Sequence, residues 1–195
     1  QGKTRTKICN TRSVHRVSCG KFQYNPLRMM DSAFYSLQCV FQDEDATVLF
    51  ARRLEQALGR AHSEILEKGL NLRLTGDLGA GKTTLTRALL RALGVTGRVK
   101  SPTFELVSDY TVLGDIEFHH FDFYRFESPV EFEDARFRDL FGPARITASE
   151  WSEKAMPYLP QADIEITLDI EGEGRTATLK AFSPLGRTIV QEIAQ

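Results

Sequence analysis

The sequence predicts an α/β fold in which a mixed central sheet is flanked by helices in three layers. Three observations lead to this prediction. A short apolar run at 70–74 stops at a glycine-rich loop, and a helical pattern follows that loop. Two later strand patterns are joined by a short turn, which makes that strand pair antiparallel. The chain then forms a further strand pair around a second turn, a C-terminal antiparallel hairpin.

Composition limits the classes of protein to which the chain can belong. Its 195 residues suffice for one domain, with or without an appendage. No apolar run approaches the roughly 20 residues that span a bilayer, so we expect no membrane association. Cys9, Cys19 and Cys39 match no zinc or disulfide spacing, and the absence of cysteine after residue 39 is consistent with a cytoplasmic location.

Residues 1–28 differ from the rest of the chain in charge. They carry seven basic residues and no acidic one, which leaves 18 of the 25 basic residues and all 26 acidic residues, a net charge of −8, for the remainder. Three explanations remain open: an RNA- or lipid-binding arm, a targeting segment, or sequence outside the natural reading frame. Met29-Met30, followed by an ordinary domain, favours the last of these. We expect 1–28 to be a disordered or weakly attached extension and 29–195 to form a single domain.

The first predicted elements lead up to the glycine-rich loop. Residues 36–41 form a short strand, and the acidic residues at 43–45 begin a helix that keeps a 3.6-residue apolar period to residue 67. Gly69 ends this helix, and the apolar run at 70–74 is the next strand. Beyond the loop, leucines at 85, 89, 90 and 93 describe a second helix that stops at Gly94.

Two strands and a helix follow. Ser101-Pro102 interrupts the pattern, and a strand leaves this break through 104–110. A turn at 113–115 joins it to a strand at 116–122, on which Ile116, Phe118, His120 and Asp122 share one face. Ser128-Pro129 is predicted to cap a helix that continues to residue 141.

The last predicted elements are strands. A short strand at 144–149 is followed by a loop at 156–160. The strictly alternating run at 164–170 turns at 171–174 and returns from residue 176, which completes the hairpin. Its two-sided polarity predicts that the hairpin lies at an edge of the sheet.

The loop at 76–83, GDLGAGKT, matches the G-x-x-x-x-G-K-[ST] pattern of a phosphate-binding P-loop. Glycine lets the backbone turn tightly and bring its N–H groups to phosphate oxygens, where the next helix presents the positive end of its dipole. We expect Lys82 to reach the β- and γ-phosphates and the Thr83 hydroxyl to bind Mg²⁺. The strand before the loop and the helix after it favour this over a glycine-rich turn with an incidental lysine.

A metal bound with ATP requires further oxygen ligands, so an acidic residue should end a strand beside the loop. Asp122 and Glu150 both follow strand patterns, and spacing favours Asp122, whose strand is longer and more apolar. A carboxylate that caps a helix or pairs with Arg125 is the alternative for either. Ser101 and Thr103 lie in the connection that often senses the γ-phosphate, with an ordinary hydroxyl turn as the alternative.

Three ring-bearing residues near these acids are interpreted more simply. His119 and His120 have no metal-ligand spacing to another histidine, cysteine or acidic cluster, so we interpret them as strand residues. Trp151 is interpreted as a core aromatic, or as a ring that packs near the nucleotide because it follows Glu150.

Four segments together resemble the TsaE family, also called YjeE, which is the ATPase of bacterial tRNA threonylcarbamoyladenosine synthesis. They are GDLGAGKTT at 76–84, KSPTFELV at 100–107, HFDFYR at 120–125 and SEW at 149–151. The P-loop alone is generic, whereas its combination with the other three segments is specific. The resemblance covers about residues 43–170 and departs from the family at Ser152, where proline often follows the EW pair.

The resemblance implies a P-loop NTPase-like fold, with 29–195 as a single P-loop ATPase domain, and ATP or ADP with Mg²⁺ as cofactors. The implied nucleotide-binding residues are Asp77, Leu78, Gly79, Ala80, Gly81, Lys82, Thr83 and Thr84, with Glu44 and Thr47 on the adenine side and Trp151 nearby. Thr83 and Glu150 are the implied Mg²⁺ ligands, in place of the choice of Asp122 that spacing favours. Asp122 would then act in hydrolysis beside the metal or by positioning water, together with Lys82 and the switch hydroxyl of Thr103.

The resemblance also implies partners. The family works with TsaD and TsaB, after TsaC has made threonylcarbamoyl-adenylate, to modify adenosine 37 of tRNAs that read ANN codons. Contact with tRNA is expected only through that complex, and ATP hydrolysis is thought to reset it. We expect slow hydrolysis by the isolated chain, because the sequence offers no arginine finger at a fixed position.

Two other functions would also use a P-loop. A small-molecule kinase would carry an arginine-bearing lid, for which Arg136 and Arg138 could serve, although both are equally typical of exposed helix charges. A nucleotide-sensing module is the other alternative. No N-K-x-D sequence is present to read guanine, which argues against a GTPase.

Overall fold

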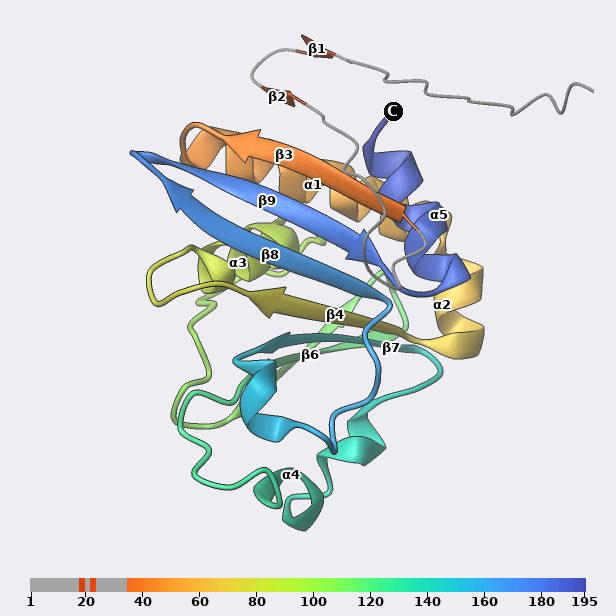
Figure 1. Cartoon of the computed structure of the whole chain (residues 1–195). Coiled ribbons are helices and arrows are strands. Elements are labelled where there is room, and N and C mark those ends of the chain that lie inside the picture. The colour runs from red at the N-terminus through yellow and green to blue at the C-terminus, as the bar shows by residue number, and fades with distance from the viewer. Residues whose placement is uncertain (1–17, 20–21, 24–34) are drawn as a thin grey trace, which may run out of the picture.

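The computed structural model describes residues 18–19, 22–23 and 35–195, and places a seven-stranded sheet between layers of helices (Figure 1). Most of 1–28, including the predicted weak attachment of this segment, lies outside the described residues. Within it, β1 (Ser18–Cys19) pairs antiparallel with β2 (Phe22–Gln23).

The large sheet and its helices come from the rest of the chain. The strands are β3 (Tyr35–Phe41), β4 (Leu70–Thr75), β5 (Val107–Val112), β6 (Ile116–Asp122), β7 (Arg145–Glu150), β8 (Ile164–Glu171) and β9 (Gly174–Ala181). The helices are α1 (Glu44–Arg60), α2 (His62–Lys68), α3 (Lys82–Ala92), α4 (Glu131–Asp134) and α5 (Pro184–Ile193), with 3-10 turns η1 (Phe137–Leu140) and η2 (Ser152–Ala155). No described helix is both long and apolar enough to pass through a lipid bilayer.

The strand order explains why distant motifs meet. The order is β3-β9-β8-β4-β7-β6-β5, in which β4 runs parallel to both β8 and β7, and β7 runs parallel to β6. Parallel strands end at the same edge of a sheet, and the register pairs Leu74 with Glu150 and Glu150 with Asp122. Glu150 therefore ends the strand next to the loop that leaves β4, and Asp122 ends the following strand at the same edge. Ligands of open α/β sheets bind at this carboxyl edge.

Two apolar clusters cover the two faces of the sheet. Helices α1, α3 and α5 pack on one face around a core that includes Phe41, Phe50, Leu54, Leu58, Leu72, Leu89, Ile166, Leu179 and Ile189. Odd and even residues of β6 alternate between faces, so Phe118 joins this core while Phe121 joins a second cluster. That second cluster is mostly aromatic and lies with α4, η1 and η2, where the Phe121 and Phe123 rings stack with centroids 5.4 Å apart.

The mixed sheet and the closing hairpin were predicted correctly, but the position of the hairpin at a sheet edge is wrong. β9 pairs antiparallel with β3 on one side and β8 pairs parallel with β4 on the other, so the hairpin lies inside the sheet. The edges of the sheet are β3 and β5. Alternating polarity indicates that one face of a strand is covered by the core. It does not indicate whether the strand has a neighbour on each side, so an interior strand can show it as well.

Several helix predictions also require correction. The helix predicted from 43 to 67 is two helices, since the chain turns at Ala61 between α1 and α2. The helix predicted from 128 to 141 reduces to α4 and η1, because Arg136 adopts a left-handed conformation with φ 55°. The strand predicted from 104 begins only at Val107, after Leu106 with φ 67°.

Helix α5 was not predicted at all. Ser183 caps it by accepting a hydrogen bond from the Gly186 N–H at 3.0 Å, and Pro184 occupies its first turn. Leu185, Ile189 and Val190 are buried in the core, which is the 3.6-residue pattern that identifies a helix. The Ser-Pro pair and this spacing were both readable in the sequence.

Candidate functional site

The loop between β4 and α3 is shaped by two glycines. Gly76 has φ 133°, and a Cβ atom at this position would lie 2.4 Å from the Leu168 carbonyl oxygen of β8. Gly81, with φ 106°, is the residue immediately before α3. Both conformations are unfavourable for residues with a side chain, so the loop requires glycine at its beginning and at its end.

The Lys82 ammonium group is held inside the loop. Its Nζ donates hydrogen bonds to the carbonyl oxygens of Gly76 at 2.5 Å and Asp77 at 2.9 Å. It also lies 4.2 Å from the ring centroid of Trp151, within the range of a cation–π interaction. Lys82 is only 5% exposed and all three of these partners are formally neutral. An anion that entered the loop would therefore be a stronger partner than any of them.

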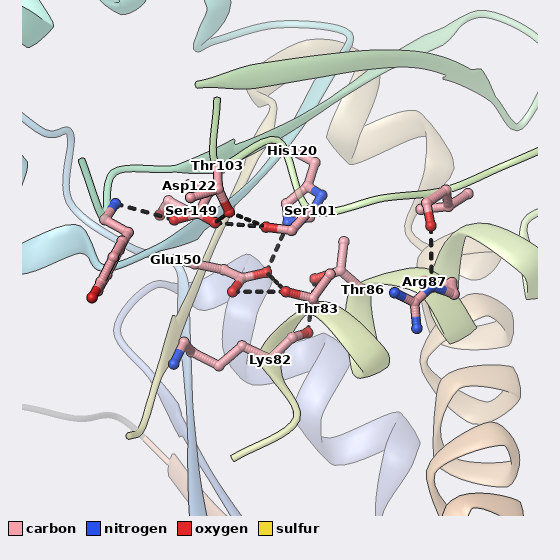
Figure 2. A network of polar contacts seen from close by, with 12 residues as sticks. Lys82, Thr83, Thr86, Arg87, Ser101, Thr103, His120, Asp122, Ser149 and Glu150 are labelled. Carbon is pink, nitrogen blue, oxygen red and sulfur yellow. Dashed lines mark hydrogen bonds and ion pairs between the residues drawn. The ribbon is translucent and has the colours of Figure 1, made fainter. Parts of the chain in front are cut away.

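Glu150 is the centre of the first polar group at this edge of the sheet (Figure 2). The Thr83 hydroxyl donates to both of its carboxylate oxygens, at 3.0 and 3.1 Å. The Nε2 atom of His120 lies 2.8 Å from Glu150 Oε1, and a carboxylate can only accept, so Nε2 carries the proton of that bond. Glu150 and His120 are 2% and 0% exposed, so this group is shielded from solvent.

Asp122 is the centre of the second group. The hydroxyls of Ser101 and Thr103 both donate to its Oδ2 atom at 2.6 Å, and lie 2.8 Å from each other. The Tyr124 N–H donates to Oδ1 at 3.1 Å. The alternative prediction was that Asp122 pairs with Arg125. Instead, the Arg125 guanidinium lies over the Phe104 ring, 3.9 Å from its centroid.

Two cavities adjoin the loop. The larger, about 380 Å³, is lined by Leu78, Gly79, Gly81, Lys82, Thr83, Thr84, Ser101, Thr103, Asp122, Tyr124, Glu150 and Trp151. The smaller, about 200 Å³, includes Phe41, Asp43, Glu44, Thr47, Gly79, Ala80, Gly81, Thr84, Leu168 and Arg175. The structure thus brings together nearly every residue predicted for the site. Asp77 contributes its carbonyl to Lys82, and its side chain is exposed.

The donor set at the larger cavity fits Mg²⁺ carried by a nucleotide. The Thr83 hydroxyl and the Glu150 carboxylate supply hard oxygen atoms side by side, which is the ligand type that Mg²⁺ prefers. Among the described residues, no group of three or more histidines, cysteines and acids is arranged to hold a metal alone. The contact with Thr83 favours Glu150 over Asp122 for this role.

Sequence reasoning missed two residues of this region. His120 was correctly predicted to lie in a strand, but its hydrogen bond with Glu150 was not predicted. The available signal was that His120 shares a face of β6 with Asp122. Arg175 was not considered. Its guanidinium contacts the loop from β9, and only the strand order, which is absent from the local sequence, places it there.

A family model described as "Threonylcarbamoyl adenosine biosynthesis protein TsaE" matches residues 41–177, which include all four motifs and both missed residues. The chain belongs to the TsaE family. The tRNA threonylcarbamoyladenosine biosynthesis protein TsaE of Haemophilus influenzae is 41% identical over 155 residues, which cover 80% of this chain and 96% of that protein. The TsaE protein of Bacillus subtilis is 31% identical over 141 residues, covering 72% and 87%.

The fold agrees with this family. The crystal structure of YdiB from Bacillus subtilis superposes with a TM-score of 0.61 and 25% identity, covering 82% of this chain and 94% of that one. The resemblance to TsaE and the P-loop NTPase-like α/β fold expected from the sequence are therefore confirmed. The roles of individual residues in binding and catalysis stay predictions.

Proposed function

We propose that this chain binds ATP together with Mg²⁺, hydrolyses it, and acts in the synthesis of threonylcarbamoyladenosine in tRNA. Its membership of a family named for that synthesis supports the pathway. One structural observation supports the chemistry: the Thr83 hydroxyl meets the Glu150 carboxylate in a cavity that Lys82 also lines, although the three come from α3 and β7. This is the arrangement with which P-loop proteins hold a metal-bound triphosphate.

Each part of the site has a task in this proposal. The N-terminus of α3 and the Lys82 ammonium hold the phosphates. Thr83 and Glu150 would hold Mg²⁺, which would supply positive charge to the phosphoryl group when bound. Asp122 fixes the hydroxyls of Ser101 and Thr103 beside the same cavity, where they orient the attacking water or sense the γ-phosphate.

We propose that a partner accelerates the activity. Lys82 is the only cation among the described residues that line the larger cavity, so no arginine of this part of the chain is in place to stabilise the transition state. Charge supplied by another protein is a common solution and is worth a factor of about 10³–10⁵ in rate. We propose that the partner is the TsaD–TsaB pair, in the modification of adenosine 37 of ANN-reading tRNAs in the cytoplasm, with tRNA contacted only through that complex.

Turnover measurements with purified components test the proposal. We expect slow Mg²⁺-dependent release of phosphate by the chain alone and faster release after TsaD and TsaB are added. Repeated threonylcarbamoylation of tRNA, followed by mass spectrometry with TsaC present, should require the chain and fail with Lys82→Ala. Absence of nucleotide binding would contradict the ATPase proposal, whereas binding without any response to TsaD–TsaB would contradict only the partner.

The arginines considered for a kinase lid lie elsewhere. Arg138 donates hydrogen bonds to the Tyr158 carbonyl and to Glu133, and Arg136 lies at the junction of α4 and η1. Neither is among the residues that line the two cavities beside the loop. No observation on the described residues therefore favours the kinase alternative.

A further inference from the structure

We infer that Arg175 is a positioning residue for the P-loop, and that it orients the peptide whose N–H group faces the phosphates. Arg175 lies near the start of β9, directly after the turn that joins β8 to β9. Its Nε donates a hydrogen bond to the Ala80 carbonyl at 3.1 Å, and its Nη2 donates to the Gly79 carbonyl at 3.4 Å. This role rests on the proposed nucleotide binding.

The remaining nitrogen of the guanidinium faces the hairpin turn. Nη1 donates to the carbonyl oxygens of Gly174 at 2.7 Å and Glu173 at 3.4 Å. The three nitrogens of this rigid, planar group therefore donate to four backbone carbonyls. Two of these carbonyls belong to the loop and two to the hairpin turn. The group bridges two segments about 95 residues apart and is not a free cation directed at a substrate.

By holding the Ala80 carbonyl, Arg175 also fixes the direction of the Gly81 N–H. The Ala80 carbonyl and the Gly81 N–H belong to one planar trans peptide, so they point in opposite directions. A P-loop binds phosphate through its N–H groups, so holding the carbonyl on the outer side keeps the N–H on the inner side. Gly79 and Gly81 flank Ala80 with φ of 81° and 106°, and glycine allows such a peptide to rotate at low cost. An anchor on the carbonyl prevents that rotation.

The same hairpin also supports the first turn of the loop. The Gly76 backbone packs so closely on the Leu168 carbonyl of β8 that no side chain would fit between them. The loop therefore rests on β8 at Gly76 and on β9 at Ala80. Since β8 and β9 are neighbours in the sheet, both supports belong to one rigid unit. The loop is held in shape before a ligand arrives, which lowers the entropic cost of binding.

Arg175 also lines the smaller cavity, so a direct contact with ribose or base is the competing explanation. The two explanations differ in which ligands they affect. Loop positioning affects ligands in proportion to their phosphates, whereas a base or ribose contact affects adenosine as much as ADP. A purely structural role would lower the melting temperature and leave both affinities unchanged.

Three variants of the full chain test the inference: Arg175→Met, Arg175→Lys and, as a matched control, Arg187→Met at an exposed position on α5. In calorimetric titrations we expect Arg175→Met to weaken ADP binding about tenfold without changing the affinity for adenosine. Arg175→Lys should restore little, because lysine keeps the charge but cannot contact two carbonyls with a planar fork. Arg187→Met should match the unmodified chain. An equal loss for adenosine, or full rescue by lysine, would overturn the inference.

A measurement without nucleotide separates this inference from the proposed function. Amide hydrogen exchange of residues 76–83 in the free protein should be faster in Arg175→Met than in the unmodified chain and in Arg187→Met. Unchanged exchange would overturn the positioning role even if ADP binds normally. If the unmodified chain binds no ADP at all, the proposed function fails, and faster exchange would still show that Arg175 holds the loop.

Discussion

Asp122 and Glu150 occupy equivalent positions in two neighbouring strands but have different partners. Each is the last residue of its strand, the register places them opposite each other, and they are 3% and 2% exposed. Glu150 contacts the P-loop threonine and a buried histidine. Asp122 accepts hydrogen bonds from two hydroxyls of the 101–106 segment and from the Tyr124 N–H.

The difference shows that burial and position at a strand end do not decide what a carboxylate does. The segments that fold over each strand end decide it. The helix that follows the P-loop brings a hydroxyl to Glu150, and the connection after that helix brings two hydroxyls to Asp122. We therefore expect Glu150 to act on the metal and Asp122 to act on the attacking water or the switch segment.

The largest effect should come from Lys82→Ala, which removes the ammonium group that we expect to bind the phosphates. We expect nucleotide affinity to fall about 100-fold, the value for losing contacts between a charged group and phosphate. Titration calorimetry with ADP and with a nonhydrolysable ATP analogue measures it. The exposed Lys100→Ala serves as the control and should bind normally. Retained affinity in Lys82→Ala would remove the lysine from the phosphate site.

The next effect compares the two carboxylates directly. Glu150→Gln should raise the Mg²⁺ concentration needed for half-maximal turnover by about tenfold or more, because the amide is a poor ligand for the ion. Asp122→Asn should leave that concentration unchanged and lower turnover at saturating Mg²⁺. Mg²⁺ titrations of phosphate release at saturating ATP measure both. The reversed pattern would assign the metal to Asp122, as strand spacing alone suggests.

Glu150→Ala is expected to lose metal-dependent turnover while the fold survives. The change leaves the buried His120 without its acceptor, which costs about 1–3 kcal/mol. Urea unfolding followed by circular dichroism should therefore show a lower midpoint with a cooperative transition retained. Full activity in this variant would exclude Glu150 from the metal site.

A smaller effect is expected from the hydroxyls that contact Asp122. Thr103→Ala and Ser101→Ala should each lower turnover about tenfold, since each removes one of the two short bonds to Asp122 Oδ2. Mg²⁺ dependence and ADP affinity should not change. Thr96→Ala, in the exposed loop before this segment, is the matched control. A change in Mg²⁺ dependence would mean that this segment also supports the metal.

An effect of similar size tests how Glu150 is held. In His120→Gln the side-chain amide nitrogen can take the place of Nε2, whereas in His120→Asn it is too short to do so. We expect His120→Asn to raise the Mg²⁺ concentration needed for half-maximal turnover about tenfold, as is common when a residue that orients a metal ligand is lost. His120→Gln should restore most of the original Mg²⁺ affinity. Manganese binding in the presence of ADP, followed by electron paramagnetic resonance, gives a readout besides turnover. Equal behaviour of the two variants would contradict a positioning role for His120.

The fold was predictable where evidence was local. Residue spacing alone identified the P-loop, the strand before it and the helix after it, and alternation identified the β8–β9 hairpin. The predictions failed where neighbours mattered. The hairpin was assigned to an edge because its polarity was read without knowing that β3 and β4 flank it. The helix at 128–141 was interrupted by the left-handed Arg136.

The sequence by itself determined the glycine-rich loop, the residues that surround it and the two strand-end acids, because backbone conformation and side-chain type depend on short stretches of chain. Only the tertiary structure decided that Thr83 contacts Glu150 directly, that His120 holds that acid, and that Arg175 supports the loop from β9. These contacts join residues separated by 30 to 95 positions. The strand order creates them, and no local pattern of the sequence encodes that order.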